Sequence, residues 1–279
     1  MRKRGQLEMA EKAHERSVAV VTGGGRGLGR SMVLALARTG IHVVATAARE
    51  RKEIEAVARQ SEENSTAGTV VPVLADVTRA CDCEMVVAAA VKRFGRLDIL
   101  VNNAGRGMKY VSDSFLTEPT HFWETSPEAW RLIVDTNING PFLMARSAAP
   151  LMIRARWGRI INISMNRETM RRRGFSPYGP SKAALESETI IWAQELAGTG
   201  VTVNALLPGG ATRTGMVPDG VSDEVRSTLL DAEVIVPPLL WLISKDADQM
   251  TGKRLVANKW RPDLSAREAA ETAAEPAGW

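Results

Sequence analysis

The segment Tyr178-Gly179-Pro180-Ser181-Lys182 places a phenol and an ammonium group four positions apart. In a helix, positions i and i+4 share one face, so the two side chains would lie side by side. A phenol has an ordinary pKa near 10, and a neighbouring cation lowers it by stabilising the phenolate. The pair would then exchange protons nearer neutral pH. Taken alone, however, the pair is better explained as an exposed tyrosine beside a solvated lysine. Pro180 is tolerated only in a first helical turn, which predicts a helix start near Ser176 or Pro177.

The elements that must position this pair alternate between short apolar runs and helical patterns. Continuous β-branched runs predict strands buried on both faces, over residues 17–21, 43–46, 70–74, 97–101, 159–163 and 201–206. Helical patterns cover 30–38, 50–60, 83–94, 127–152 and 182–196, the fourth interrupted by Asn137, Gly140 and Pro141. This alternation predicts an α/β fold: a single doubly wound Rossmann-type domain with a parallel sheet flanked by helices.

We expect three parts along the chain. Residues 1–16 read as a flexible basic leader, residues 17–261 as the Rossmann-fold catalytic domain, and residues 262–279 as a C-terminal tail. Within the tail, Ser265-Ala266-Arg267-Glu268 has the spacing of a capping box, which favours a short helix. The tail is poor in large apolar residues, so a solvated segment is the alternative.

Composition excludes several classes of protein. The 279 residues carry a net charge of +4, are 44% hydrophobic and include two cysteines, which indicates a globular chain without a disulfide framework and predicts a cytoplasmic location. The weak net charge argues against nucleic acid as a partner, and no apolar run approaches the roughly 20 residues of a membrane span. Cys81 and Cys83 have no histidine or second cysteine pair nearby, so no metal site is expected.

A glycine turn, Thr22-Gly23-Gly24-Gly25-Arg26-Gly27-Leu28-Gly29, joins the first predicted strand to the first helix. Gly23 permits a sharp turn, Gly27 lets a phosphate approach the backbone, and Gly29 lets the helix pack closely on the strand. The helix N-terminus offers free N–H groups and a positive dipole end to a pyrophosphate. The context favours a dinucleotide site over an ordinary glycine-rich turn, and no Gly-Lys-Ser/Thr follows, so the turn is not a P-loop.

Two further polar turns follow the third and fourth predicted strands. Asp76-Val77 comes after the third, where the carboxylate could accept from an adenine amino group, and Asn102-Asn103-Ala104-Gly105 comes after the fourth. Open α/β sheets bind ligands at the carboxyl ends of their strands, so these turns would face the same ligand as the glycine turn. Ordinary turn chemistry explains each of them separately.

These residues together resemble the short-chain dehydrogenase/reductase family, in the compact-subunit group of 3-oxoacyl-carrier-protein reductases and sugar or alcohol dehydrogenases. The resemblance implies that Tyr178 protonates a carbonyl oxygen, that Lys182 holds the nicotinamide ribose and lowers the tyrosine pKa, and that Asn137 supports a water in a proton relay. The cofactor would supply the hydride. A homo-oligomer, dimer or tetramer, is also implied. The implied cofactor contacts are Gly23, Gly25, Arg26, Gly27, Leu28, Gly29, Arg49, Asp76, Val77, Asn103, Ala104, Gly105, Tyr178, Lys182, Pro208, Gly209, Ala211 and Thr212.

The sequence departs from the family pattern at the catalytic serine, which usually stands thirteen residues before the tyrosine. That position is Met165 here, and Ser164 stands one place earlier. Neighbouring residues of a strand point to opposite faces. Either a local shift presents Ser164 as the catalytic serine, or the usual hydroxyl is missing and Asn166 or Thr169 contacts the substrate. The family's closing acidic-Gly-Gly motif is also replaced, by Val256-Ala257-Asn258-Lys259, which puts the usual subunit packing at that edge in doubt.

The end of the second strand predicts that NADP(H) is favoured, with NAD(H) as the alternative. Selective NAD binders of this fold carry an acidic residue there, whereas this sequence has Ala47 and Ala48. Arg26 and Arg49 lie near enough to pair with a 2′-phosphate.

We therefore expect an oxidoreductase that interconverts a ketone or aldehyde and an alcohol. The alternative is a catalytically silent nucleotide-binding sensor or partner-binding protein. Arg171-Arg172-Arg173 precedes Tyr178 and would recognise an anionic substrate group, unless it is only a solvated loop.

Overall fold

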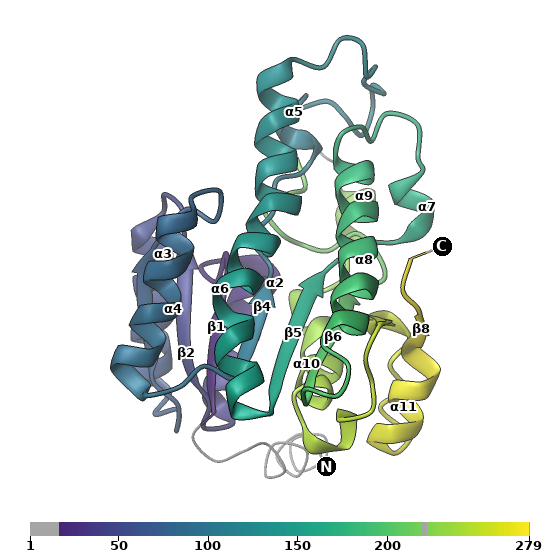
Figure 1. Cartoon of the computed structure of the whole chain (residues 1–279). Coiled ribbons are helices and arrows are strands. Elements are labelled where there is room, and N and C mark those ends of the chain that lie inside the picture. The colour runs from purple at the N-terminus through teal and green to yellow at the C-terminus, as the bar shows by residue number, and fades with distance from the viewer. Residues whose placement is uncertain (1–16, 219–221, 279) are drawn as a thin grey trace.

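The computed structural model of the chain describes residues 17–218 and 222–278, so the leader predicted over residues 1–16 lies outside the described part. Its centre is an eight-stranded sheet in the order β3-β2-β1-β4-β5-β6-β7-β8 (Figure 1). Neighbouring strands from β3 to β7 pair in parallel, and β8 pairs antiparallel with β7. The strands are β1 Val18–Val21, β2 His42–Ala47, β3 Val70–Leu74, β4 Ile99–Asn102, β5 Gly158–Ile163, β6 Val201–Leu207, β7 Lys253–Val256 and β8 Ala274–Pro276.

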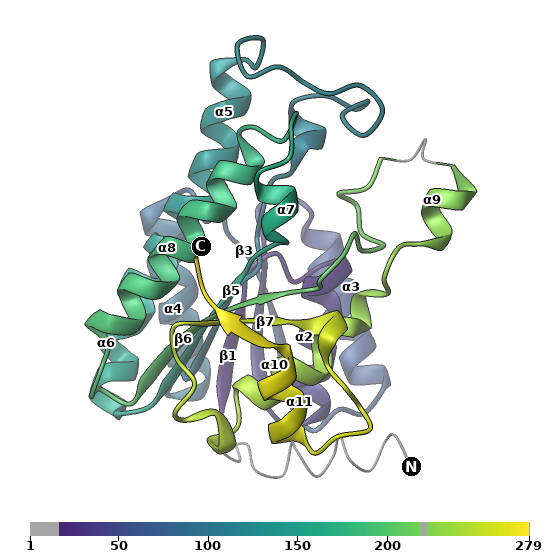
Figure 2. The same cartoon turned by 90° about the vertical axis from the view of Figure 1, so that its right-hand side faces the viewer.

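Helices cover both faces of this sheet, as Figure 2 shows edge-on. One buried apolar cluster joins the sheet to α2, α3, α10 and α11, and a second joins it to α4, α6 and α8. The doubly wound fold predicted from the sequence is therefore confirmed. The helices are α2 Gly27–Arg38, α3 Arg51–Glu63, α4 Ala80–Phe94, α5 Pro127–Val134, α6 Gly140–Ala155, α7 Arg167–Met170, α8 Tyr178–Glu195, α9 Asp223–Ser227, α10 Val236–Leu242 and α11 Ala266–Ala273.

The long helical segment after β4 is broken where the sequence interrupts its pattern. Helix α5 starts after Ser126, whose hydroxyl accepts from the N–H of Ala129. A π-helical turn, Asp135–Asn139, then separates α5 from α6. The extra residue in such a turn rotates its side chains relative to a regular helix, and π turns occur frequently at functional sites. This turn contains Asn137.

The tail after residue 262 is an integral part of the sheet. The Ser265 hydroxyl accepts from the Glu268 N–H, and the Glu268 carboxylate accepts in return from the Ser265 N–H, which completes the capping box of α11. The helix buries Ala269, Ala270 and Ala273, and β8 pairs with β7 directly after it. The alternative of a solvated tail is wrong, because small alanines suffice to pack this helix closely on the sheet.

No helix in the described ranges is both long enough and apolar enough to cross a membrane.

Candidate active site

The glycine turn between β1 and α2 forms a backbone cradle that side chains would fill. Gly23 and Gly27 adopt positive φ angles of 64° and 51°. A Cβ on Gly29 would lie 2.1 Å from the carbonyl oxygen of Gly23, so only glycine fits there. Helix α2 begins at Gly27, and its N-cap residue Arg26 makes no side-chain capping bond. The first N–H groups of a helix have no partner within the helix, so this turn could offer those of α2 to a pyrophosphate.

The turn after β4 interlocks with this cradle. Asn103 Nδ2 donates to the carbonyl oxygens of Thr22 and Gly23, at 2.9 and 3.0 Å. In return, Thr22 Oγ1 accepts from the backbone N–H groups of Asn103 and Ala104, both at 3.0 Å. The side chain of Asn103 therefore shapes the glycine turn, and Ala104 and Gly105 continue along its rim.

Three of the expected cofactor residues, Leu28, Asp76 and Val77, make contacts within the protein around the glycine turn. Asp76 Oδ1 accepts from the Thr78 N–H and hydroxyl, so this oxygen stabilises its own turn. Val77 is buried against α6, where a Cβ on Gly140 would lie 2.8 Å from its Cγ2. Leu28 packs on the core beneath the turn. These side chains hold the cradle in place more than they face a ligand.

Thr214, which the sequence did not single out, lies closer to the cradle than Thr212. The Thr212 hydroxyl donates to Gly210 O within its own loop, and residues 211–212 pair with Leu230. A Cβ on Gly27 would instead lie 2.9 Å from Thr214 Cγ2. The loop after Pro208 and Gly209 thus reaches the glycine turn through Thr214, two residues further along than expected.

Tyr178 is the first residue of α8 and Lys182 lies one helical turn further along, where that helix packs on the end of β5. The Lys182 ammonium group is buried and donates to the carbonyl oxygen of Ile163 at 2.7 Å. The Tyr178 hydroxyl lies 4.0 Å from the Met216 sulfur atom. Helix α8 begins at Tyr178, close to the predicted start, so the pair shares one helical face as the spacing indicated.

The π-helical turn brings Asn137 to the same place. Its Nδ2 donates to Ser181 Oγ and to the Arg106 carbonyl, both at 2.9 Å, and its Oδ1 accepts from the Arg106 N–H at 2.8 Å. Asn137 therefore ties the loop after β4 to the helix that carries the tyrosine and lysine.

Comparison with known proteins identifies this arrangement. The family model described as short chain dehydrogenase matches residues 17–224. The chain belongs to the short-chain dehydrogenase family. Among its relatives, it is 36% identical to a 3-oxoacyl-[acyl-carrier-protein] reductase of Synechocystis sp. over 192 residues, 69% of this chain and 73% of the relative. It is 33% identical to a short-chain type dehydrogenase/reductase of Picea abies over 253 residues, 86% and 90% of the two chains.

A solved structure of a dehydrogenase/reductase from Sinorhizobium meliloti superposes with a TM-score of 0.77 at 28% identity, covering 90% of this chain and 97% of that one. This short-chain dehydrogenase is accordingly an oxidoreductase, and its fold and family were both predicted from the sequence.

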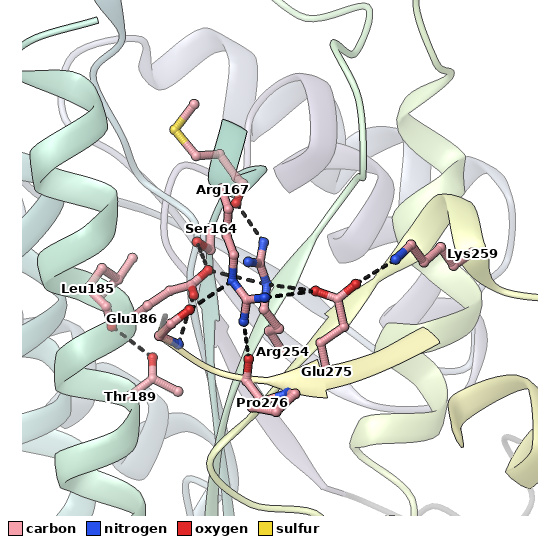
Figure 3. A network of polar contacts seen from close by, with 11 residues as sticks. Ser164, Arg167, Leu185, Glu186, Thr189, Arg254, Lys259, Glu275 and Pro276 are labelled. Atoms are coloured by element: carbon pink, nitrogen blue, oxygen red, sulfur yellow. Dashed lines mark hydrogen bonds and ion pairs between the residues drawn. The ribbon is translucent and has the colours of Figure 1, made fainter. Parts of the chain in front are cut away.

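Ser164, an expected catalytic residue, points away from the tyrosine of this short-chain dehydrogenase. Its hydroxyl donates to Glu186 Oε1 at 2.7 Å, and both side chains are buried (Figure 3). Met165 instead packs with Tyr178 against Met108, Phe115 and Phe175. No local shift of β5 turns the serine toward the site. The geometry therefore favours the second expectation, that the usual hydroxyl is missing beside the tyrosine.

The apolar surroundings reverse the direction expected for the tyrosine pKa. Desolvation by the surrounding protein raises the pKa of Tyr178 to about 12. Burial also lowers the pKa of Lys182 to about 8, against the opposing effect of the Glu186 carboxylate. The expectation of a lowered tyrosine pKa assumed a lysine directed at the phenol, whereas the ammonium here is held by Ile163 O.

Arginines gather beside the glycine turn, and one of them was not anticipated. Arg26 and Arg49 are exposed, and Arg26 lies 3.6 Å from Glu53. Arg106, directly after the Asn103–Gly105 turn, is half-buried, with its guanidinium 4.5 Å from the centre of the Tyr110 ring. Burial and the charges of Arg49 and Arg26 lower the pKa of Arg106, with Asp76 opposing them. These four charged side chains therefore share one region.

Among the described residues, no group of three or more His, Cys, Asp or Glu side chains is arranged to hold a metal ion.

Proposed function

We propose that this protein reduces a ketone or aldehyde to an alcohol, and catalyses the reverse oxidation, with Tyr178 as the general acid or base. The observation that carries the proposal is the position of Lys182, whose ammonium group is fixed to the end of β5 one helical turn from the tyrosine. Held there, the ammonium faces Ile163 O rather than the phenol, so it would serve the reaction by binding the nicotinamide ribose, as the resemblance implies. Tyr178 would give its proton to the carbonyl oxygen, and general acid catalysis of this kind typically contributes about 10²- to 10⁴-fold.

A nicotinamide cofactor fits the cradle, and it would supply the hydride. The N–H groups at the start of α2 would bind its pyrophosphate, with Gly23 and Gly29 leaving room for the backbone to approach. Lys182 would hold the nicotinamide ribose, as the resemblance implies, and Thr214 borders the phosphate region through its contact with Gly27. Asn137, held by the Arg106 backbone and Ser181 Oγ, would support a water in a proton relay from Tyr178, as the resemblance implies.

NADP(H) is the preferred cofactor in this proposal. Arg49 and Arg106 have no carboxylate within ion-pair distance among the residues that the structure describes, so their charges are available to a 2′-phosphate. Arg26 shares its charge with Glu53, which makes it the weakest of the three contacts. Guanidinium groups match phosphate with paired, charge-assisted donors.

The substrate in this proposal combines an apolar part with an anionic group. The wall beside Tyr178 is formed by Met108, Phe115, Met165 and Phe175, which offer no hydroxyl to the carbonyl. At its rim, the Arg172 guanidinium lies 5.2 Å from the centre of the Phe175 ring and is exposed. An anionic group of the substrate would meet Arg172 while its carbonyl reaches Tyr178. Relatives named 3-oxoacyl-[acyl-carrier-protein] reductases make 3-oxoacyl thioesters the first compounds to try.

The test is turnover of a panel of 3-oxoacyl thioesters and of neutral and anionic ketones, each with NADPH and with NADH. The proposal expects NADPH oxidation that depends on the carbonyl compound. Tight binding of NADPH without turnover of any panel member would instead favour the nucleotide-binding sensor.

A further inference from the structure

Five consecutive residues at the end of β5, residues 163–167, are each held by a separate polar contact. The first three are held by buried charged side chains: Lys182 Nζ on Ile163 O at 2.7 Å, Glu186 on Ser164 Oγ at 2.7 Å, and Arg254 on Met165 O at 2.8 Å. Asn166 Nδ2 then donates to Gly209 O at 3.1 Å. Arg167 donates to Gly278 O and Pro276 O, at 2.8 and 2.5 Å. This segment links the strand to the turn after β6 and to the C-terminus.

Glu186 and Arg254 form the centre of this network, as Figure 3 shows. Their side chains are 1% and 2% exposed, and Arg254 Nε lies 3.5 Å from Glu186 Oε1. Burying such a pair is costly unless further hydrogen bonds satisfy both groups. Glu186 receives two of them, from Ser164 Oγ and from the N–H of Gly278 at 3.0 Å. The Glu186 carboxylate is thus satisfied in part by the C-terminal Gly278, whereas Arg254 donates one hydrogen bond, to Met165 O, and its Nε and Nη1 have none in the described part of the chain. Glu186 stands one helical turn from Lys182.

The strand β8 closes the network from the other side through Glu275. Its carboxylate lies 3.9 Å from Arg254 and 3.6 Å from Arg167, and it accepts from Lys259 Nζ at 2.5 Å. The Glu275 carboxylate thus lies between two arginines: Arg254, which binds Met165 O, and Arg167. Through Arg254 and Arg167, β8 is therefore linked to the segment that carries Met165.

We propose that the C-terminal strand is a working part of the active site, with Arg167, Glu186, Arg254 and Glu275 as positioning residues for Lys182 and Met165. The proposal rests on the proposed function, since it assigns these residues to the same reaction. Ile163 O is the group that orients the Lys182 ammonium, and this network adds side-chain contacts to Ser164 and Met165 beyond the backbone bond from Ser164 N–H to Leu206 O. Loss of a positioning contact lowers the rate because misplacement of reacting groups by about 1 Å can cost on the order of 10²-fold.

The experiment compares Arg167→Ala with Arg261→Ala in the full chain. Arg261 is a matched control, since it pairs with Asp263 near the same terminus and belongs to no contact of this network. We expect Arg167→Ala to lower kcat about 5- to 20-fold, a part of the misplacement penalty. The Kd for NADPH, from its fluorescence, and the Tm should stay close to those of the wild type. Arg167→Lys should recover part of kcat, and Glu275→Gln should lower it in the same direction.

Hydrogen–deuterium exchange gives a readout that does not depend on turnover. Arg167→Ala should speed amide exchange in peptides covering residues 163–170, and Arg261→Ala should leave them unchanged. Unchanged exchange in Arg167→Ala overturns the inference whether or not the wild type turns over any carbonyl. Faster exchange with wild-type kcat also overturns it, because the network would then be structural only. If the wild type turns over no carbonyl compound, the proposed function is contradicted, and the exchange measurement still tests the network.

Discussion

Ser164 and Met165 are neighbours on the chain, but their side chains point in opposite directions at the end of β5. The Ser164 hydroxyl is bonded to Glu186 on α8, and the Met165 side chain packs against the same apolar cluster as Tyr178. The alternation of side chains along a strand forces this division once β5 continues without a bulge up to Ile163. The residue in the usual place of the catalytic serine is thus apolar, and the serine has become part of the polar network behind the site.

Ser164→Ala is expected to lower kcat by less than about tenfold, since the serine does not reach the reacting atoms. Tyr178→Phe is expected to lower kcat much more. It should reduce the free energy of unfolding by about 1.5–3 kcal/mol, the usual worth of a hydrogen bond to a charged group. Steady-state kinetics and urea unfolding measure the two effects. Equal kinetic losses in the two variants would show that Ser164 does act on the substrate.

Carbonyl reduction should decline as the pH rises through about 8. Burial depresses the pKa of Lys182 to about 8, so its ammonium group loses its proton there, whereas Tyr178, with a pKa of about 12, stays protonated far above that pH. The phenol remains able to donate its proton, so the decrease of kcat/KM above pH 8 reports deprotonation of Lys182. The kcat/KM profile of the free enzyme reports this group. A profile that stays flat to pH 10 would contradict the assignment.

Arg106→Ala should reduce kcat/KM for NADPH by about 10-fold or more and leave that for NADH nearly unchanged, because a charge-assisted contact is worth about 1.5–3 kcal/mol. Arg26→Ala should show a smaller selective loss, since Arg26 is already paired with Glu53. Arg131, an exposed arginine on α5 paired with Glu128, provides the control substitution. Equal efficiency of the wild type with both cofactors would contradict the NADP(H) preference.

Glu188→Gln should stabilise the protein at pH 8. Burial raises the pKa of Glu188 from 4.5 to about 7, and its Oε2 has no hydrogen-bond partner in the described part of the chain. A raised pKa in the folded state means that stability is present below pH 4.5 and is lost as the pH rises through about 7. The neutral amide removes this loss, so the Tm should increase by a few degrees at pH 8 and hardly change at pH 4.5. A lower Tm at pH 8 would contradict the account.

Much of the architecture could be read from local patterns. The alternation of β-branched runs with helical periodicity predicted the six strands β1–β6, and the pattern breaks at Asn137 and Gly140 mark the π-helical turn and the start of α6. The strands β7 and β8 were not predicted, because both are short and β8, Ala274–Pro276, has no strand-forming side chains. It is a strand through its pairing with β7 and through the contacts of Glu275.

The candidate site was predictable in its motifs but not in its side-chain directions. Spacing alone could not show that Ser164 faces Glu186, that Thr214 rather than Thr212 reaches Gly27, or that Arg106 joins Arg49. The pKa of Tyr178 depends on how completely the neighbouring methionines and phenylalanines exclude water, which no local pattern reports. Self-association, expected from the resemblance, stays a prediction.

The most direct test of the central claim is kcat of Tyr178→Phe in carbonyl reduction, measured with saturating NADPH on the best compound of the panel. The substitution removes one hydroxyl, whose nearest partner is the Met216 sulfur at 4.0 Å, so the fold and the NADPH Kd should be preserved. If Tyr178 is the general acid, kcat falls by at least about 10²-fold, the lower end of what such catalysis supplies. A variant that binds NADPH normally and keeps more than half of the wild-type kcat would contradict the account.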